Sequence, residues 1–184
     1  MANWTDTIWE VVLPTKNVNK FLKGFLFDTY GSREDEVIKR FGSNESKKRY
    51  VNTFVLIETL HEEEYTSTLT RLRFSSTCRW SFRSSALIDT ALDGFKQVSA
   101  DAWCLKHDVR YLNVVSDELG MSFRETFFYD KDNDVDFVYD CRTIDYFTCE
   151  QCDTYGIWED YPEDSDKTIC PECGCKFEED EDDE

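Results

Sequence analysis

The stretch from Cys149 to Gly174, CEQCDTYGIWEDYPEDSDKTICPECG, determines the fold of the C-terminal part of this chain. It contains two CxxC pairs separated by seventeen residues. Each pair places two sulfurs on one side of a tight turn, and two facing turns supply four thiolates to a tetrahedral zinc ion. Because protein would fill all four positions, the metal would stabilise the fold and leave no position open for a substrate. The sequence therefore predicts a zinc ribbon with one structural Zn²⁺, whose ligands are Cys149, Cys152, Cys170 and Cys173.

The residues beside the two pairs fit this prediction and leave one alternative ligand. Gly174 follows the second pair and can adopt the positive φ that the turn requires. Asp153 follows the first pair, and aspartate tolerates that conformation better than most residues. Cys175 lies two residues beyond Cys173 and could provide the fourth thiolate in its place. The two-residue spacer favours Cys173.

The alternative interpretation is that these cysteines form two disulfides, which require an oxidising compartment. The N-terminus lacks the charged and then apolar segment of an export signal, so we expect a reducing cytosol. A thioredoxin-like redox site would need a CxxC at the start of a helix after a strand, which neither pair has. We expect the scattered Cys78, Cys104 and Cys141 to pack as small core residues. No run of eighteen apolar residues is present, so the sequence predicts no membrane span and a cytoplasmic protein.

The negative charge of the chain is concentrated near its C-terminus. The formal net charge is −18, and residues 150–184 carry fifteen acidic side chains against only Lys167 and Lys176. Four thiolates and one Zn²⁺ would add a further charge of about −2 to the ribbon. Nucleic-acid backbones attract positive charge, so direct binding of DNA or RNA by the ribbon is disfavoured.

Two acidic runs are candidates for contact with a basic partner protein. One lies in the loop between the cysteine pairs, and the other is the tail of seven acidic residues that ends the sequence. The simpler interpretation of such a tail is a solvated segment without a partner. The candidate partner-binding residues are Glu159, Asp160, Glu163, Asp164, Asp166, Glu178, Glu179, Asp180, Glu181, Asp182, Asp183 and Glu184.

Residues 1–145 alternate between strand and helix patterns. A β-rich segment covers residues 5–14, and Asn17 is a candidate N-cap for a helix whose apolar face is Val18, Phe21, Leu22, Phe25 and Leu26. Residues 50–60 and 65–76 predict an antiparallel hairpin connected through residues 61–64. Ser84 or Ser85 can cap a second helix whose face is Ile88, Ala91, Leu92, Phe95 and Val98. Further strands are expected at residues 103–105, 109–115, 121–129 and 135–139, with a turn at 131–134.

The order of these segments is βαββαβ followed by extra strands. This order predicts an α+β fold, the ferredoxin-like plait, in which two helices cover one face of an antiparallel sheet. We therefore expect a ferredoxin-like domain at residues 1–145, a four-cysteine zinc ribbon at 146–177 and an acidic tail at 178–184.

Three short motifs resemble a known family. The opening Met1-Ala2-Asn3-Trp4, the segment FSSTCRWS from Phe74 to Ser81, and Glu118-Leu119-Gly120 are similar to motifs of the YubB-type ferredoxin-like proteins of phages and plasmids. The resemblance covers roughly residues 1–140, and Thr5 stands where that family is expected to have a cysteine. It implies a ferredoxin-like fold and an origin in a mobile element, and it implies no activity.

No combination of residues in the sequence predicts catalysis. The two histidines, His61 and His107, lie in expected loops without a cysteine or serine in a nucleophile context. The phosphate-binding patterns GxxxxGK[ST] and GxGxxG are absent from the sequence. We therefore expect a protein that is not an enzyme.

Two functional hypotheses follow from these observations. The first is a phage or plasmid accessory protein whose carboxylates bind a basic host protein, which can be a nucleic-acid-binding one. By binding it, the accessory protein would inhibit a host defence system. The second is a nucleic-acid-binding module that the acidic tail inhibits. Its candidate contacts are arginines and tryptophans, namely Arg71, Arg73, Arg79, Arg83, Trp4, Trp9, Trp80 and Trp103. The simpler interpretation of these arginines is surface ion pairing. The sequence does not indicate the oligomeric state.

Overall fold

The computed structural model describes residues 4–27, 39–41, 55–79, 87–89, 96–118 and 122–177. All structural statements below refer to these residues. None of the helices in this part of the chain is long and apolar enough to cross a membrane.

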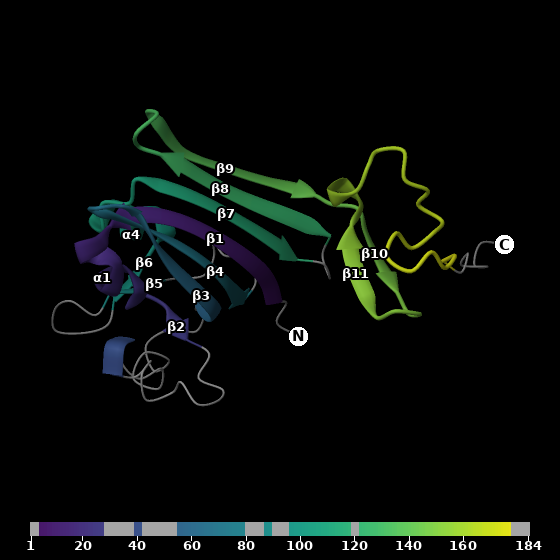
Figure 1. Cartoon of the computed structure of the whole chain (residues 1–184), viewed down its shortest axis with the longest axis horizontal. Coiled ribbons are helices and arrows are strands. Elements are labelled where there is room, and N and C mark those ends of the chain that lie inside the picture. The colour runs from purple at the N-terminus through teal and green to yellow at the C-terminus, as the bar shows by residue number, and fades with distance from the viewer. Residues whose placement is uncertain are drawn as a thin grey trace.

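A single mixed sheet of seven strands forms the main body of the structure (Figure 1). Its spatial order is β2-β3-β4-β1-β7-β8-β9, and only the pairing of β2 with β3 is parallel. The strands are β1 (Trp4–Pro14), β2 (Leu26–Phe27), β3 (Val55–Thr66), β4 (Leu69–Arg79), β7 (Tyr111–Glu118), β8 (Phe123–Asp130) and β9 (Val135–Thr143). Strand β1 lies at the centre, so the first strand in the sequence contributes side chains to the middle of both faces.

Side chains alternate between the two faces of this sheet, as the period of two in a β-strand requires. On β7, every second residue from Leu112 to Glu118 is buried. The buried side chains define an inner face, and the residues between them form an outer face that is more exposed. Trp9 lies in the core on the inner face, stacked on Phe74 with ring centroids 5.3 Å apart and contacted edge-on by Phe25.

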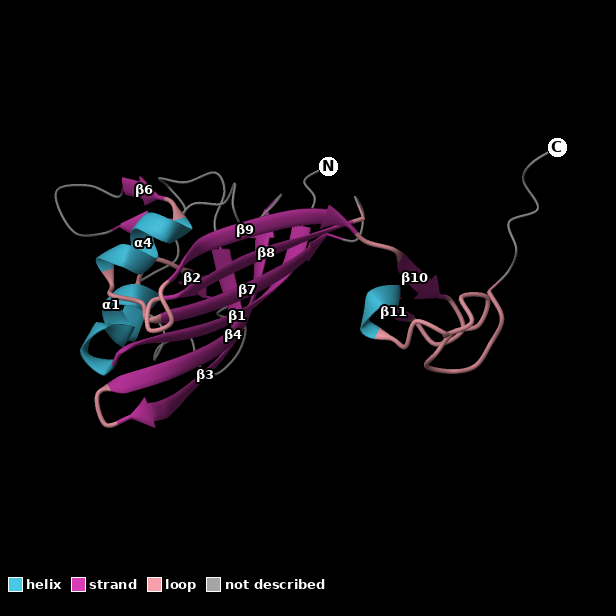
Figure 2. Cartoon of the chain, turned by 90° about the horizontal axis from the view of Figure 1, so that it is seen from above, coloured by secondary structure: helices cyan, strands magenta, loops and turns pink. Residues whose placement is uncertain are grey.

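The helices pack at the end of the sheet that lies away from the cysteines (Figure 2). They are the 3₁₀ turn η1 (Thr15–Asn17), α1 (Val18–Leu22) and α4 (Ala100–Lys106). The predicted apolar face from Val18 to Leu26 is buried throughout. Asn17 is the N-cap residue of α1, but its side-chain amide donates instead to the carbonyl of His107. Trp103 lies over the end of α1, where its Nε1 donates to the Phe21 carbonyl at 3.0 Å.

Gly24 permits this contact between the two helices. A Cβ at this position would lie 2.6 Å from the Trp103 indole ring, closer than real Cβ atoms approach. The apolar spacing predicted one helix through Leu26, but α1 ends at Leu22, so Gly24 lies outside it and Leu26 belongs to β2.

The predicted ferredoxin-like plait is wrong. The structure is mostly β in its described part, with a mixed sheet of seven strands, and the helices α1 and α4 are only five and seven residues long. The central strand β1 lies between β4 and β7 and is antiparallel to both. Two long helices covering an antiparallel sheet are not found in the described part of the chain.

The predicted second helix accounts for much of this error. Residues 87–89 and 96–98 of the expected helix are the antiparallel strands β5 (Leu87–Asp89) and β6 (Lys96–Val98). Residues 84–86 and 90–95 of that prediction lie outside the described residues. The helix begins later, at Ala100, and it includes Trp103 to Leu105, which were expected to form a strand.

Other expected strands are present with shifted limits. The strand at 5–14 and the hairpin of β3 and β4 are found, but residues 61–64 lie inside β3 and the turn is at Ser67 and Thr68. The strands expected at 109–115, 121–129 and 135–139 correspond to β7, β8 and β9, and the turn at 131–134 is confirmed.

The C-terminal part forms a separate small unit beyond the other end of the sheet (Figures 1 and 2). It consists of the hairpin β10 (Tyr146–Cys149) and β11 (Thr154–Ile157), the turn η3 (Trp158–Asp160) and an irregular segment to Phe177. We call residues 146–177 the ribbon. The acidic tail predicted at residues 178–184 lies outside the described residues.

The cysteines outside the ribbon differ in their surroundings. Cys78 and Cys104 are buried, as expected of small core residues. Burial raises the pKa of the Cys78 thiol to about 11, so it is neutral at physiological pH. Cys141 is exposed on β9, so its assignment to the core was wrong.

Candidate metal centre

The first cysteine turn follows directly from the β10–β11 hairpin. Cys149 ends β10 and Thr154 begins β11, so Cys152 lies in the connecting turn. Asp153 has a φ of 53°, the positive value expected from its place in the pattern. Aspartate adopts this conformation at a lower cost than most residues other than glycine.

Backbone hydrogen bonds shape the second turn around Cys170. The N–H of Gly174 donates to the Cys170 carbonyl at 2.8 Å, and the N–H of Cys170 donates to the Cys175 carbonyl at 2.8 Å. Gly174 has a φ of 74°, which is unfavourable for residues with a side chain. This confirms the predicted reason for glycine after the second pair.

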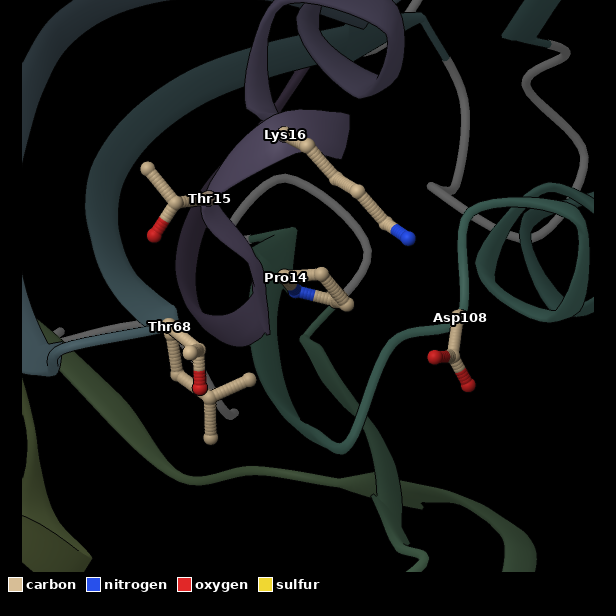
Figure 3. A pocket seen from close by; sticks show the side chains of 6 residues that line it. Pro14, Thr15, Lys16, Thr68 and Asp108 are labelled. Carbon is tan, nitrogen blue, oxygen red and sulfur yellow. The ribbon is translucent and has the colours of Figure 1, made fainter.

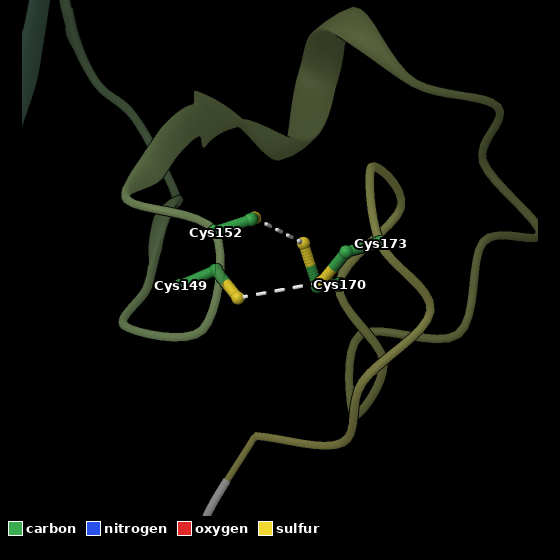
Figure 4. A group of neighbouring side chains, drawn as sticks. All are labelled: Cys149, Cys152, Cys170 and Cys173. Carbon is green, nitrogen blue, oxygen red and sulfur yellow. Dashed lines mark hydrogen bonds between the residues drawn. The ribbon is translucent and has the colours of Figure 1, made fainter.

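The two turns bring their four sulfurs together (Figure 4). The Sγ atoms of Cys149, Cys152, Cys170 and Cys173 all lie within 4.8 Å of one another. Cys149 and Cys173 are 3.7 Å apart, and Cys152 and Cys170 are 3.9 Å apart. A tetrahedron with metal–sulfur bonds of about 2.3 Å has sulfurs about 3.8 Å apart. None of these cysteines is in a disulfide, so all four are available to one metal ion.

Cys175 lies beside this cluster as a fifth thiol. Its Sγ is 3.2 Å from that of Cys149 and 3.1 Å from that of Cys173. Both distances are shorter than the edge of a zinc–thiolate tetrahedron, about 3.8 Å. Cys175 therefore lies within hydrogen-bonding distance of Cys149 and Cys173, and it stays the alternative to Cys173 as the fourth candidate ligand.

Hydrogen bonds directed at Cys149 favour its thiolate form. The thiol of Cys175 and the backbone N–H groups of Gln151 and Cys152 lower the pKa of Cys149 to about 6. The thiolate is the form of cysteine that binds metal ions.

A small aromatic cluster packs against the sulfurs. The ring of Phe147 lies 4.7 Å from Trp158 and 5.7 Å from both Tyr161 and Phe177, between ring centroids. Gly156 faces Phe147 across the hairpin, and a Cβ at Gly156 would lie 2.7 Å from this ring. The ribbon therefore has its own core, but a much smaller one than the sheet.

One arginine of the sheet connects the ribbon to the main body. Arg124 on β8 makes a bidentate contact with Asp117, at 2.7 and 3.1 Å, and also contacts Asp160 of the ribbon at 3.3 Å. Its side chain is only 13% exposed. Hydrogen bonds from the guanidinium to Asp117 raise the pKa of Arg124, and those to Asp160 add to this effect.

A cavity of about 300 Å³ lies beside this contact, and we call it the junction cavity. It combines carboxylates from both units with aromatic and aliphatic side chains, and Tyr155 of β11 contacts Asp6 of β1 across it at 3.5 Å. Its lining residues are Asp6, Ile8, Asp117, Tyr155, Gly156, Ile157, Asp160 and Tyr161. The sequence contained no signal for it, because the two sides are almost 150 residues apart in the chain.

The acidic loop residues predicted for partner binding have different surroundings. Glu159 pairs with Arg142 at 2.6 Å, and Asp160 pairs with Arg124. Asp166 accepts hydrogen bonds from the backbone and hydroxyl of Thr168, so it stabilises the loop. Glu163 and Asp164 are exposed and have no ion pair among the described residues.

The residues proposed for nucleic-acid binding are largely engaged within the sheet. Arg71 and Arg73 lie together on the outer face, where each contacts both Glu10 and Glu63. These contacts agree with the simpler interpretation of the two arginines, which is ion pairing on the surface. Trp9 and Trp103 are 1% and 2% exposed, so neither ring is open to a base. The side chains of Arg79, Arg83, Trp4 and Trp80 lie outside the description.

The predicted loop is wrong for His61 and correct for His107, which lies in the turn after α4. His61 lies within β3, opposite Arg73. His107 follows α4 and is 5% exposed, with its ring 4.3 Å from that of Trp103.

A further cavity of about 450 Å³ lies at the helical end of the sheet (Figure 3). Its labelled lining residues include Lys16 and Asp108. Thr15 and Thr68, which also line it, are joined by a backbone hydrogen bond, and the Thr15 hydroxyl contacts that of Thr70 at 2.9 Å. These hydroxyl and amide groups close the end of the sheet.

Comparisons with protein-family models, with curated proteins and with solved structures found no match to this chain. The resemblance to YubB-type proteins therefore stays a prediction, and the ferredoxin-like fold that it implied is not the fold of this structure.

Proposed function

We propose that the four clustered cysteines bind one Zn²⁺ and that this ion has a structural role. Distances of 3.7 and 3.9 Å between sulfurs support a tetrahedral ion, and thiolates in two CxxC turns are typical ligands of zinc. Four protein ligands would leave no open coordination position for a substrate.

The ribbon, held by this ion, would present a binding surface for a basic protein. On this proposal the chain is a non-enzymatic accessory protein of a phage or plasmid, acting in the bacterial cytoplasm. Its partner would be a basic host protein, including a nucleic-acid-binding one, and its effect would be inhibition of a host defence system.

The junction cavity is the observation that carries this proposal. Its lining contains three aspartates, Asp6, Asp117 and Asp160. Arg124 pairs with Asp117 and Asp160, so the three carboxylates exceed the single cation that pairs with them. Tyr155, which is 57% exposed, and Ile8, which is 60% exposed, add apolar surface at the same place. Carboxylates beside aromatic rings suit the charged end and the apolar stem of an arginine or lysine side chain.

The rest of the ribbon would attract such a partner at longer range. Residues 146–177 carry eight acidic side chains against two lysines, and the seven residues of the tail are all acidic. Charges of this kind raise the rate of association and are screened by salt.

A defined basic probe tests the role of the cavity. A fluorescent arginine-rich peptide is titrated into the full chain, into Asp6→Asn and into Asp140→Asn, an exposed carboxylate on β9 that serves as the matched control. We expect Asp6→Asn to weaken binding about five-fold more than Asp140→Asn. Equal losses in the two variants would show a response to net charge alone and would contradict a site at the junction.

A second experiment tests the tail and identifies the partner. The full chain and a chain ending at Phe177 are used to capture proteins from a nuclease-treated bacterial lysate. We expect a basic protein to bind the full chain with a higher association rate than the truncated chain. An unchanged rate would contradict a role for residues 178–184. Capture that is seen in an untreated lysate, disappears with nuclease and increases without the tail would support nucleic-acid binding instead.

A further inference from the structure

The inner face of the sheet changes from apolar to polar toward the ribbon. Next to the hydrophobic core, the strand register places four polar residues side by side across β4, β1, β7 and β8. These residues are Ser76, Thr7, Ser116 and Glu125, and each is at most 2% exposed. We call them, together with the neighbouring Glu118, the polar row.

Four members of the polar row make hydrogen bonds, either with one another or with a neighbouring side chain. The hydroxyls of Thr7 and Ser116 are 2.8 Å apart, and Trp9 Nε1 donates to Ser76 Oγ at 2.8 Å. Tyr139 on β9 donates its hydroxyl to Glu125 Oε1 at 2.5 Å. Each of these four polar side chains therefore has a hydrogen-bond partner inside the protein.

Glu118 differs from the other members of the polar row because one of its carboxylate oxygens has no hydrogen-bond partner among the described residues. It is the last residue of β7 and is 2% exposed, with its side chain on the inner face. Its Oε2 is shielded from solvent and accepts no hydrogen bond within the described part of the chain. Burying a carboxylate oxygen without a partner is unfavourable, and a bound cation would compensate it.

The register places a second buried carboxylate within reach of the first. Glu118 lies opposite Phe123, and Glu125 lies two residues further along the same strand on the same face. Such diagonal positions are about 7–8 Å apart between strands, so two glutamate side chains can converge on one ion.

We propose that Glu118 and Glu125 bind a divalent cation of the class that prefers oxygen ligands, Mg²⁺, Mn²⁺ or Ca²⁺. Carboxylates and hydroxyls are the donors that these cations take, and the hydroxyls of Thr7 and Ser116 lie in the same row. This site is separate from the cysteine centre in position and in ligand chemistry. It is also separate from the junction cavity, which Asp6 and Asp117 line from the outer face of the sheet.

Mn²⁺ binding to the full-length, zinc-loaded chain tests this site. The paramagnetic resonance signal of free Mn²⁺ disappears on binding, and zinc already occupies the thiolates. Binding is compared in 0.3 M KCl, which screens exposed acidic side chains, for the wild-type chain, Glu118→Gln and the matched surface control Asp140→Asn. We expect one bound Mn²⁺ in the wild type and in the control, and at least ten-fold weaker binding in Glu118→Gln.

Absence of Mn²⁺ binding by the wild-type chain, or equal affinity in Glu118→Gln, would overturn the proposal. If Glu118→Gln does not fold, the thermal midpoint of the wild-type chain decides the question. A midpoint that rises with Mn²⁺ supports the site, and one that does not respond to Mn²⁺, Mg²⁺ or Ca²⁺ overturns it.

Discussion

The main body of the chain and its ribbon differ in what stabilises them. Among the described residues, twenty-two buried residues form the main core and four form that of the ribbon, and two of these four are cysteines of the candidate metal centre. Apolar burial contributes about 25 cal/mol per Å², so the main body can order its chain through its core. The ribbon is below the size at which a core alone is sufficient, and such units require metals or disulfides. We therefore expect the stability of the main body to depend on its apolar core and that of the ribbon to depend on the metal ion.

Removal of a candidate metal ligand is expected to have the largest effect on stability, because it should unfold the ribbon and leave the main body folded. Cys170→Ser should unfold residues near 146–177 and leave the sheet folded, since structural zinc contributes about 10–16 kcal/mol to small zinc domains. Zinc stoichiometry and amide resonances of both units measure this outcome. Cys141→Ser, an exposed cysteine outside the cluster, is the matched control. One full equivalent of zinc in Cys170→Ser would show that the ligand assignment is wrong, and loss of zinc in Cys175→Ser would assign Cys175 as a ligand.

A pair of glycine substitutions sharpens the comparison. Gly24→Ala should destabilise the main body by about 1–3 kcal/mol, because its Cβ would lie 2.6 Å from Trp103. Gly156→Ala should leave the main body unchanged and weaken the ribbon, because its Cβ would lie 2.7 Å from Phe147. Chemical denaturation followed separately by Trp103 and by zinc release distinguishes the two. Loss of both signals together in either variant would show that the units unfold as one.

The contact between the units depends on Arg124. Arg124→Ala leaves Asp117 and Asp160 without their shared cation, and we expect a loss of about 1–2 kcal/mol in the attachment of the ribbon. Limited proteolysis near residues 144–146 and solution scattering report this detachment. Arg142→Ala removes only the contact with Glu159, so it should have a smaller effect. Equal protection of Arg124→Ala and the wild type would contradict this role.

The smallest expected effect lies in the β8–β9 turn of the main body. The side-chain amide of Asn133, and the backbone N–H groups of Asn133 and Asp132, hold the pKa of Asp130 below its usual value. A carboxyl with a lowered pKa in the folded state stabilises the fold above its unfolded pKa of about 4, and this contribution is lost as pH falls through the lower folded value. Asp130→Ala should therefore lower the thermal midpoint slightly at pH 7 and have less effect near pH 3. A difference that does not change with pH would show that ionisation of Asp130 is not the cause.

Local patterns were reliable where a short segment determines its own structure. The CxxC turns depend on spacing within a few residues, and they are found. The side chains of the apolar face from Val18 to Leu26 are buried as predicted, but only residues 18–22 form the helix, and Leu26 belongs to β2. The helix expected through Ile88 and Val98 also had a helical spacing of apolar residues, but those positions pair as strands. A short apolar pattern does not distinguish a helix from strands when tertiary pairing can satisfy the same residues.

Exposure explains the misplaced hairpin turn. Residues 58–66 of β3 are mostly exposed, so the charged run at 61–64 has the composition of a loop. Hydrogen bonding to β4 nevertheless continues through it as far as Thr66. Backbone hydrogen bonding extends β3 beyond its buried part, and the amino-acid composition of the exposed part does not predict this extension.

The sequence by itself determined the candidate metal ligands and the uneven charge, because cysteine spacing and composition are local properties of the chain. The tertiary structure decided which polar groups are available for function. The pairing of β7 with β8 placed Glu118 and Glu125 on the same buried face of the sheet. Tertiary contacts also brought Asp6 to Tyr155 and paired Glu159 and Asp160 with arginines of β9 and β8. The free energy of a carboxylate depends on its neighbours in space, and those neighbours are set by strand pairing across the whole chain.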